Sequence, residues 1–376
     1  MHKAILWEPS QKVDGAVRCL ACSHYCTIPQ GRRGVCGVRE NKEGTLYSLV
    51  YDRIIGRHPD PVEKKPLYHF LPGSMAYSFG TVGCNFSCEF CQNADMSQSP
   101  KLTHDAGEIS ERRGNASDRG DGRIWGERMT PQELVDEAVR FGCESVAYTY
   151  NEPAVFIELA LDTMRLAKER GLRNIFVSNG YESPEALDAV APYLDAMNID
   201  LKAWDDAFYA RICGARRSSV LDTIRRAHER GIWIELTTLV IPQKNDSDDE
   251  LRSIAKFIAA LDKDIPWHLS RFFPMHHMLD SEPTPMATLE RAHHIGKEEG
   301  LRYVYVGNIR EARYHNTACP KCDALCVERG AYYAGVRSLI DKGKSRKENG
   351  DGGGGKRGKD AVGRCPECGE SIAGVW

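Results

Sequence analysis

The stretch Thr81-Val-Gly-Cys84-Asn-Phe-Ser-Cys88-Glu-Phe-Cys91 places three thiols within eight residues. It overlaps the end of an apolar run, Met75 to Val82, that is typical of a buried strand. The cysteines are therefore expected on the loop at the carboxyl end of that strand, where α/β barrels place their chemistry. Three thiolates on one loop would leave one iron of a four-iron cluster open to another ligand. A zinc knuckle or three unrelated core thiols is the alternative, but zinc normally takes a fourth protein ligand and none is nearby.

The composition leaves room for a sizeable core, with 376 residues of which 41% are hydrophobic. The 50 Lys and Arg residues against 53 Asp and Glu residues give a formal net charge of -3, which predicts no bulk affinity for nucleic acid or for an anionic membrane. No apolar run approaches a membrane span, and the N-terminus lacks the apolar segment of a secretory signal, so we expect a cytoplasmic protein. The 14 cysteines fall in clusters with metal-ligand spacing, which favours reduced, metal-binding thiols over disulfides.

A regular alternation of helix and strand begins at Thr130, where Thr-Pro-Gln-Glu predicts a capped helix start. Asp246 is expected to cap a later helix in the same way. Repeated βα units with mostly apolar strands predict a parallel sheet covered by helices. Counted from Met75, six strands precede a last short one, which favours an α/β fold with a partial, open (βα)6 barrel. A doubly wound sheet is the alternative, because hydrophobic pattern does not separate the two.

Two further cysteine sets flank this region. The N-terminal set can close a tetrahedral site, with zinc as the first choice and an iron-sulfur cluster as the second. The C-terminal set forms paired C-P-x-C knuckles, the pattern of a zinc ribbon, with a rubredoxin-type iron site as the alternative. The members of the two sets are Cys19, Cys22, Cys26 and Cys36, and Cys319, Cys322, Cys365 and Cys368.

These features predict four consecutive parts of the chain. An N-terminal metal-binding module with four cysteines is followed by a lead-in segment, the barrel with a flexible insert at 101–128, and a zinc-ribbon-like module with a flexible insert at 342–363. The boundaries that we expect are 1–44, 45–74, 75–310 and 311–376.

Polar residues follow several of the predicted strands, where a barrel would bring them together. A carboxylate at Glu152 could accept hydrogen bonds from an ammonium group. Asp200 and Lys202 alternate to the same face of a strand, although such a pair on its own is as consistent with a structural salt bridge. The polar candidates at these strand ends are Asn151, Glu152, Ser178, Asn179, Asp200 and Lys202.

The C-x3-C-x2-C spacing, with an aromatic residue before Cys91, resembles the signature of the radical S-adenosylmethionine (radical SAM) superfamily. Members bind a 4Fe-4S cluster through three cysteines and present the fourth iron to SAM, so the resemblance implies that Cys84, Cys88 and Cys91 are the cluster ligands and catalytic residues. Several strand-end residues are similar to those of the pyruvate formate-lyase activating enzyme group. There, the resemblance implies SAM contacts for Glu152, Ser178, Asn179, Asp200, Lys202 and His268, and adenine packing for Ile241. At Tyr150-Asn-Glu-Pro the family usually has Gly-Gly-Glu-Pro, so Asn151 departs from the pattern.

The N-terminal cysteines, the segment Asp60-Pro-Val-Glu-Lys-Lys-Pro and the segment Ser-Arg271-Phe-Phe-Pro extend the resemblance to the AmmeMemoRadiSam branch of that group. The implied activity is reductive cleavage of SAM to a 5'-deoxyadenosyl radical that abstracts hydrogen from a substrate. The electron would come from a flavodoxin- or ferredoxin-like donor, and activation of a glycyl-radical protein is one candidate outcome. The substrate stays open between a small molecule, a protein and an RNA. A non-catalytic zinc protein on a degenerate barrel, recognising a partner or nucleic acid, is the alternative and predicts no iron.

Overall fold

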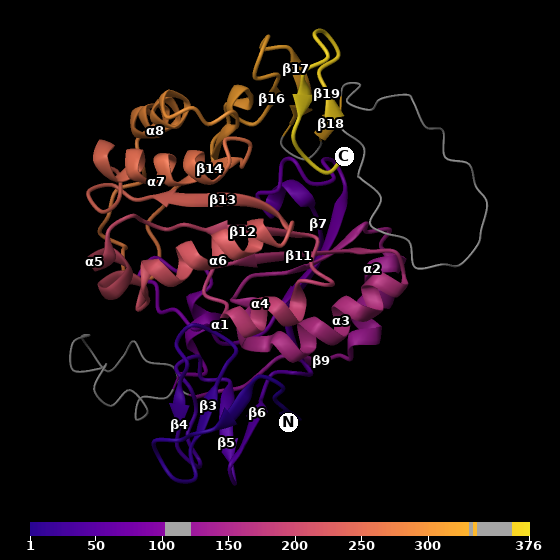
Figure 1. Cartoon of the computed structure of the whole chain (residues 1–376), viewed down its shortest axis with the longest axis vertical. Helices are drawn as coiled ribbons and strands as arrows, with labels where there is room; N and C mark the ends of the chain where they lie inside the picture. The colour runs from indigo at the N-terminus through magenta and orange to yellow at the C-terminus, as the bar shows by residue number, and fades with distance from the viewer. Residues whose placement is uncertain (102–121, 331–333, 337–362) are drawn as a thin grey trace.

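The computed structural model describes residues 1–101, 122–330, 334–336 and 363–376. Most of the predicted insert at 101–128 and nearly all of the insert at 342–363 therefore lie outside the described residues. None of the described helices has the length and apolar character needed to cross a bilayer. A nine-stranded sheet forms the centre of the described structure (Figure 1).

Seven strands of this sheet run parallel, in the order β15-β14-β13-β12-β11-β10-β8. The sheet is open, since β15 lies at one edge and does not pair with the other edge. This confirms the predicted mixed α/β fold with a partial rather than a closed barrel. The parallel strands are β8 (Met75–Gly80), β10 (Ser145–Tyr148), β11 (Arg173–Ser178), β12 (Ala196–Asp200), β13 (Trp233–Val240), β14 (Trp267–Arg271) and β15 (Val304–Gly307).

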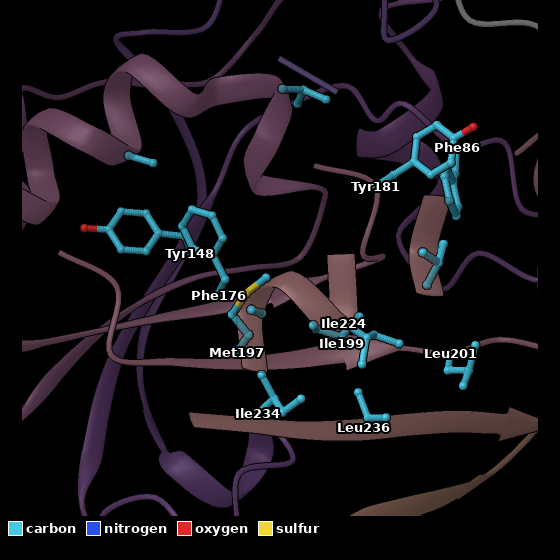
Figure 2. Close-up of a cluster of buried hydrophobic side chains, with 14 of the residues drawn as sticks. Phe86, Tyr148, Phe176, Tyr181, Met197, Ile199, Leu201, Ile224, Ile234 and Leu236 are labelled. Atoms are coloured by element: carbon cyan, nitrogen blue, oxygen red, sulfur yellow. The ribbon is translucent and has the colours of Figure 1, made fainter. Parts of the chain in front are cut away.

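Helices between the parallel strands cover one face of the sheet. Figure 2 shows Ile224 of α6 beside Ile199 of β12, with Ile234 of the next strand close by. The predicted capping box at Thr130 is present at the start of α2. The prediction for Asp246 is wrong, because Ser247 is the N-cap of α7. The longer helices are α2 (Pro131–Arg140), α3 (Ile157–Glu169), α4 (Pro184–Val190), α6 (Arg217–Glu229), α7 (Asp248–Leu261) and α8 (Met286–Glu298), and the short ones are α1 (Ala94–Gln98) and α5 (Asp206–Phe208).

The lead-in segment joins the central sheet. Its strand β7 (Arg53–Pro61) pairs antiparallel with β8, and β9 (Glu127–Arg128) pairs with β7 at the edge. The chain then covers the face of the sheet opposite the helices. Side chains from the lead-in and from four strands form a buried cluster there, and its fully buried members are Val62, Leu67, Phe70, Ala76, Ala147, Ile175 and Ala196. Burial of this face leaves the carboxyl ends of the strands as the place for a site.

Small sheets stand at the two ends of the molecule, and Figure 1 shows them on opposite sides of the central sheet. The N-terminal part contains the sheets β1-β6-β5 and β2-β3-β4, and the C-terminal part contains β16-β17-β18 and β19-β20. The last residues return to the lead-in, where the amide of Val375 donates to the carbonyl of His69 at 2.7 Å. The remaining strands are β1 (His2–Lys3), β2 (Trp7–Pro9), β3 (Val17–Cys19), β4 (Thr27–Ile28), β5 (Arg39–Lys42), β6 (Thr45–Ser48), β16 (Thr317–Ala318), β17 (Leu325–Arg329), β18 (Ala334–Val336), β19 (Gly363–Arg364) and β20 (Ser371–Ile372).

Candidate active site and metal centres

The three central cysteines lie on the loop between β8 and the short helix α1 (Ala94–Gln98), as the sequence predicts. Cys84 Sγ accepts the amide of Phe86 at 3.4 Å, and Cys91 Sγ lies 3.3 Å from the hydroxyl of Ser97. Burial raises the pKa of the Cys84 thiol to about 12. Thiolates in such a place need a bound cation, because an isolated buried negative charge is strongly disfavoured. The loop is therefore suited to a metal cluster.

Glu152 lies after β10 and forms a buried pair with Glu182, a residue that the sequence analysis did not select. Glu152 is 1% exposed and Glu182 is 2% exposed. The Ser178 hydroxyl lies 3.1 Å from Glu152 Oε2 and 2.6 Å from Glu182 Oε1, yet it has one proton to donate. Burial first, and the charge of Glu182 second, raise the pKa of Glu152 well above its usual value. Glu182 Oε2 has no hydrogen-bond partner, so the pair is suited to receive a cationic group.

Asn151 holds the start of the cysteine loop through hydrogen bonds to its backbone. Its Oδ1 accepts the amide of Thr81 at 3.2 Å, and its Nδ2 donates to the carbonyl of Gly83 at 2.6 Å. The preceding Tyr150 has a φ of 70°, a backbone conformation that glycine adopts without strain. This explains why a glycine suits the corresponding position of the Gly-Gly-Glu-Pro pattern.

Asn179, after β11, connects the carboxylate pair to the cysteine loop. Its amide donates to Glu152 Oε2 at 2.8 Å, and its Nδ2 donates to Asn85 Oδ1 at the same distance. Asn179 Oδ1 and Asn85 Nδ2 are buried without hydrogen-bond partners. Buried amides of this kind are costly unless a further group satisfies them. Polar atoms next to the cysteines are thus available to a ligand.

Asp200 and Lys202 form the ion pair that their spacing predicts, with Lys202 Nζ 2.8 Å from Asp200 Oδ2. The pair lies close to Cys88, whose thiol also contacts Cys213 at the end of the π-helical turn Tyr209–Cys213. The lysine therefore places a positive charge beside the cysteine loop.

Ile241 and His268 have no hydrogen bond or ring contact with the cysteine loop among the described interactions. Ile241 is fully buried and its amide donates to Asn245 Oδ1 at 2.6 Å. His268 Nε2 is 2.7 Å from Glu235 Oε2, and its ring stacks on Tyr305. Because Nε2 is engaged with Glu235, a contact between His268 and SAM would have to use the other ring nitrogen, Nδ1.

Two nearby residues were missed by the sequence analysis. The ammonium group of Lys101 donates to the carbonyl of Phe86 at 2.6 Å and interacts electrostatically with Cys84. Glu182 follows the Asn179-Gly-Tyr turn directly. The sequence did offer a signal for Glu182, because it is a charged residue that follows small and apolar neighbours. Lys101 gave no such signal, because its place depends on how the chain folds back.

The terminal cysteine sets differ in geometry. The C-terminal four have sulfur atoms that all lie within 4.8 Å of one another, in an arrangement that can hold a metal ion. Two of these sulfur pairs, Cys319 with Cys368 and Cys322 with Cys365, are 3.6 Å apart. Tetrahedral zinc with bonds of about 2.3 Å requires sulfur separations of about 3.8 Å. The N-terminal four line one cavity near the opposite end of the molecule.

Comparison with known proteins places this arrangement in a family. The model of the Radical SAM superfamily matches residues 79–258. "Uncharacterized protein MJ0808" of Methanocaldococcus jannaschii is 39% identical over 373 residues, which cover 99% of each chain. "Putative glycyl-radical enzyme activating enzyme MJ1632" of the same organism is 24% identical over 228 residues, 60% of this chain and 76% of that protein. A solved domain of a pyruvate-formate lyase-activating enzyme from Bacteroides vulgatus is 20% identical, with a TM-score of 0.39, and the match covers 44% of this chain and 99% of that one.

The chain belongs to the radical SAM superfamily, and it resembles the activating enzymes within it. It is accordingly an enzyme, and the alternative of a non-catalytic zinc protein is set aside. Membership implies a 4Fe-4S cluster and SAM. The residues present fit both groups, because three thiols share one loop and unpartnered buried polar atoms, Asn85 Nδ2, Asn179 Oδ1 and Glu182 Oε2, surround it.

Proposed function

We propose that Cys84, Cys88 and Cys91 hold a 4Fe-4S cluster and that SAM binds against the carboxyl ends of β10, β11 and β12. The observation that supports this most is the buried Glu152 and Glu182 pair, which lies one hydrogen-bonded residue away from the cysteine loop. A buried pair of carboxylates with an unpartnered oxygen is suited to the ammonium group of an amino acid. The bound cofactors supply one-electron cleavage of SAM to methionine and a 5'-deoxyadenosyl radical that removes hydrogen from a substrate.

In this proposal, different side chains bind different parts of SAM or hold the cysteine loop in place. Glu152 accepts hydrogen bonds from the SAM ammonium group, and Asn179 holds the Glu152 carboxylate and the cysteine loop in register. Lys202 would bind the SAM carboxylate, while Asp200 would keep the Lys202 ammonium in place and contact the ribose, as the resemblance to the activating enzymes implies. Asn151 fixes the loop through hydrogen bonds to the backbone of Thr81 and Gly83.

For the substrate, we propose a glycine of a partner protein, on the likeness to MJ1632, which is named as a putative glycyl-radical enzyme activating enzyme. The test uses an extract from cells grown on deuterated glycine, separated into protein and small-molecule fractions. Deuterium in the 5'-deoxyadenosine formed with the protein fraction supports the proposal. Deuterium transfer from neither fraction, or from the small molecules alone, contradicts it.

The activity itself is tested on protein purified without oxygen, by assaying iron and sulfide and then incubating with dithionite and SAM. We expect 5'-deoxyadenosine from the native chain and none from Cys88→Ala. The matched control is Cys143→Ala, since Cys143 is also a buried cysteine but has no part in the proposed site. An intact cluster without 5'-deoxyadenosine formation would refute the proposed function.

A further inference from the structure

The four N-terminal cysteines line one small cavity. They come from the end of β3 and from the two turns that follow, so separate pieces of backbone converge on one place. All four are buried or half-buried. The four are Cys19, Cys22, Cys26 and Cys36.

The spacing of these sulfur atoms does not match a single ion. Among the described residues, the sulfur atoms of the C-terminal four all lie within 4.8 Å of one another, whereas no three of the N-terminal four do. The cysteines of the Cys84 loop are likewise too widely spaced to meet that limit. A cluster of several irons separates its ligands more than one tetrahedral zinc does. The N-terminal set therefore shares its wide spacing with the loop that belongs to an iron-sulfur family.

A buried arginine indicates that the occupant of the cavity is negatively charged. Arg39 lines the cavity and is 2% exposed. Its Nη2 pairs with Glu158 at 2.6 Å, while its Nε and Nη1 have no hydrogen-bond partner. Neutral thiols are weak acceptors and would leave these two donors unsatisfied, whereas thiolates on a metal centre would accept hydrogen bonds from them. The cavity thus has four ligands and a fixed cation for an anionic centre.

The cavity also adjoins the Cys84 loop. Asn85, the neighbour of Cys84, lines it, and His24 Nε2 lies 2.9 Å from the carbonyl of Asn85. Gly83 has a φ of 92°, and a Cβ there would lie 2.8 Å from the carbonyl oxygen of Cys36, so the two loops touch. The C-terminal cysteines, in contrast, stand at the far end of the molecule (Figure 1). Close approach is what electron transfer between two centres requires, and a purely structural ion has no need of it.

We propose that Cys19, Cys22, Cys26 and Cys36 hold a second iron-sulfur cluster, which passes electrons to the centre at the Cys84 loop. A reduced flavodoxin- or ferredoxin-like donor would lose one electron to this cluster, and the cluster would lose one electron to the neighbouring centre. No bond to carbon forms or breaks and no proton moves in either transfer. The transfer step rests on the proposed function, but the presence of the cluster does not.

The experiment uses the full chain with Cys84, Cys88 and Cys91 all replaced by Ala, purified without oxygen. We expect this variant to retain iron and sulfide and to give an electron paramagnetic resonance signal after dithionite reduction. Adding Cys19→Ala and Cys22→Ala should remove both. Zinc at this site in place of iron would overturn the proposal. If the variant does not fold, the native chain decides, because a second cluster raises the iron from about four per chain to about six or about eight, for a two-iron or a four-iron cluster, with a matching rise in sulfide.

The transfer role has its own readout. In Cys36→Ser, SAM cleavage driven by reduced flavodoxin should fall at least about tenfold, while cleavage driven by dithionite, a small reductant, is largely retained. Equal loss with both reductants contradicts a relay. Iron in the triple variant without SAM cleavage by the native chain refutes the proposed function and leaves the second cluster standing. SAM cleavage by the native chain with no iron in the triple variant supports the proposed function and refutes the second cluster.

Discussion

Asn179 Nδ2 donates a hydrogen bond to Asn85 Oδ1 across 2.8 Å, and this contact joins the end of β11 to the loop that carries the central cysteines. The backbone amide of Asn179 donates at the same time to Glu152 Oε2. One residue therefore ties the proposed cluster loop to the proposed ammonium site. The position of each depends on the other.

Replacing Asn179 with Ala is expected to weaken SAM binding about tenfold, because a lost hydrogen bond of about 1 to 1.5 kcal/mol corresponds to that factor. The measurement is the dissociation constant of SAM for the cluster-loaded protein. Asn174→Ala is the control, since Asn174 is a buried asparagine at the other end of β11 that bonds to Met164 and Tyr193. It should lower stability and leave SAM affinity unchanged. Equal weakening in both variants would contradict a specific role of Asn179.

The carboxylate pair predicts a pH dependence. Burial and the neighbouring Glu182 raise the pKa of Glu152, so Glu152 takes up a proton at a higher pH than an ordinary glutamate. The ionised form binds an ammonium group, and SAM affinity should therefore rise as the pH increases through the raised pKa. In Glu182→Gln the repulsion is gone, and the rise should occur at a lower pH. SAM titrations across the pH range test this, and the same midpoint in both proteins would refute it.

The Arg39 and Glu158 ion pair predicts a large stability effect. Both side chains are at most 2% exposed. Glu158→Gln leaves a buried guanidinium uncompensated and should lower the free energy of unfolding by about 3 to 5 kcal/mol. Glu8→Gln, which breaks the exposed pair with Arg18, should cost no more than about 1 kcal/mol. Urea unfolding of the holoprotein measures both, and similar costs for the two would be evidence against this interpretation.

Metal removal separates the two ends of the molecule. Cys322 and Cys368 are exposed, so a chelator should extract the proposed zinc from the C-terminal set. Cys365→Ala should lose zinc and retain SAM cleavage, because β16 and β19, which lead into the C-terminal knuckles, lie on the other side of the central sheet from α1, which follows the Cys84 loop (Figure 1). Cys326→Ala is the control, since this buried thiol lies nearby but outside the ligand group. Zinc loss in the control, or loss of SAM cleavage in Cys365→Ala, would argue against the assignment.

Much of the fold followed from local pattern. Apolar strands alternating with amphipathic helices from Thr130 onward predicted the parallel sheet, and the sheet has the expected open order. The pairing of β7 with β8 could not be predicted in this way. Its residues, Arg53 to Pro61, contain prolines and glycine and show no strong alternation, so only contact with β8 makes them a strand.

The sequence by itself determined the cysteine loop after β8, the ion pair of Asp200 with Lys202 and the C-terminal knuckles. These depend on spacing along one segment, and spacing is a local property. The tertiary structure alone brought Glu182 beside Glu152, Arg39 into the N-terminal cavity, and Cys36 against the loop at Gly83. Such neighbours are separated by many residues, and no periodicity records them. Pairing of β10 with β11 places Glu182 beside Glu152, and packing of the N-terminal sheets on the central sheet buries Arg39 against Glu158 and brings Cys36 to Gly83.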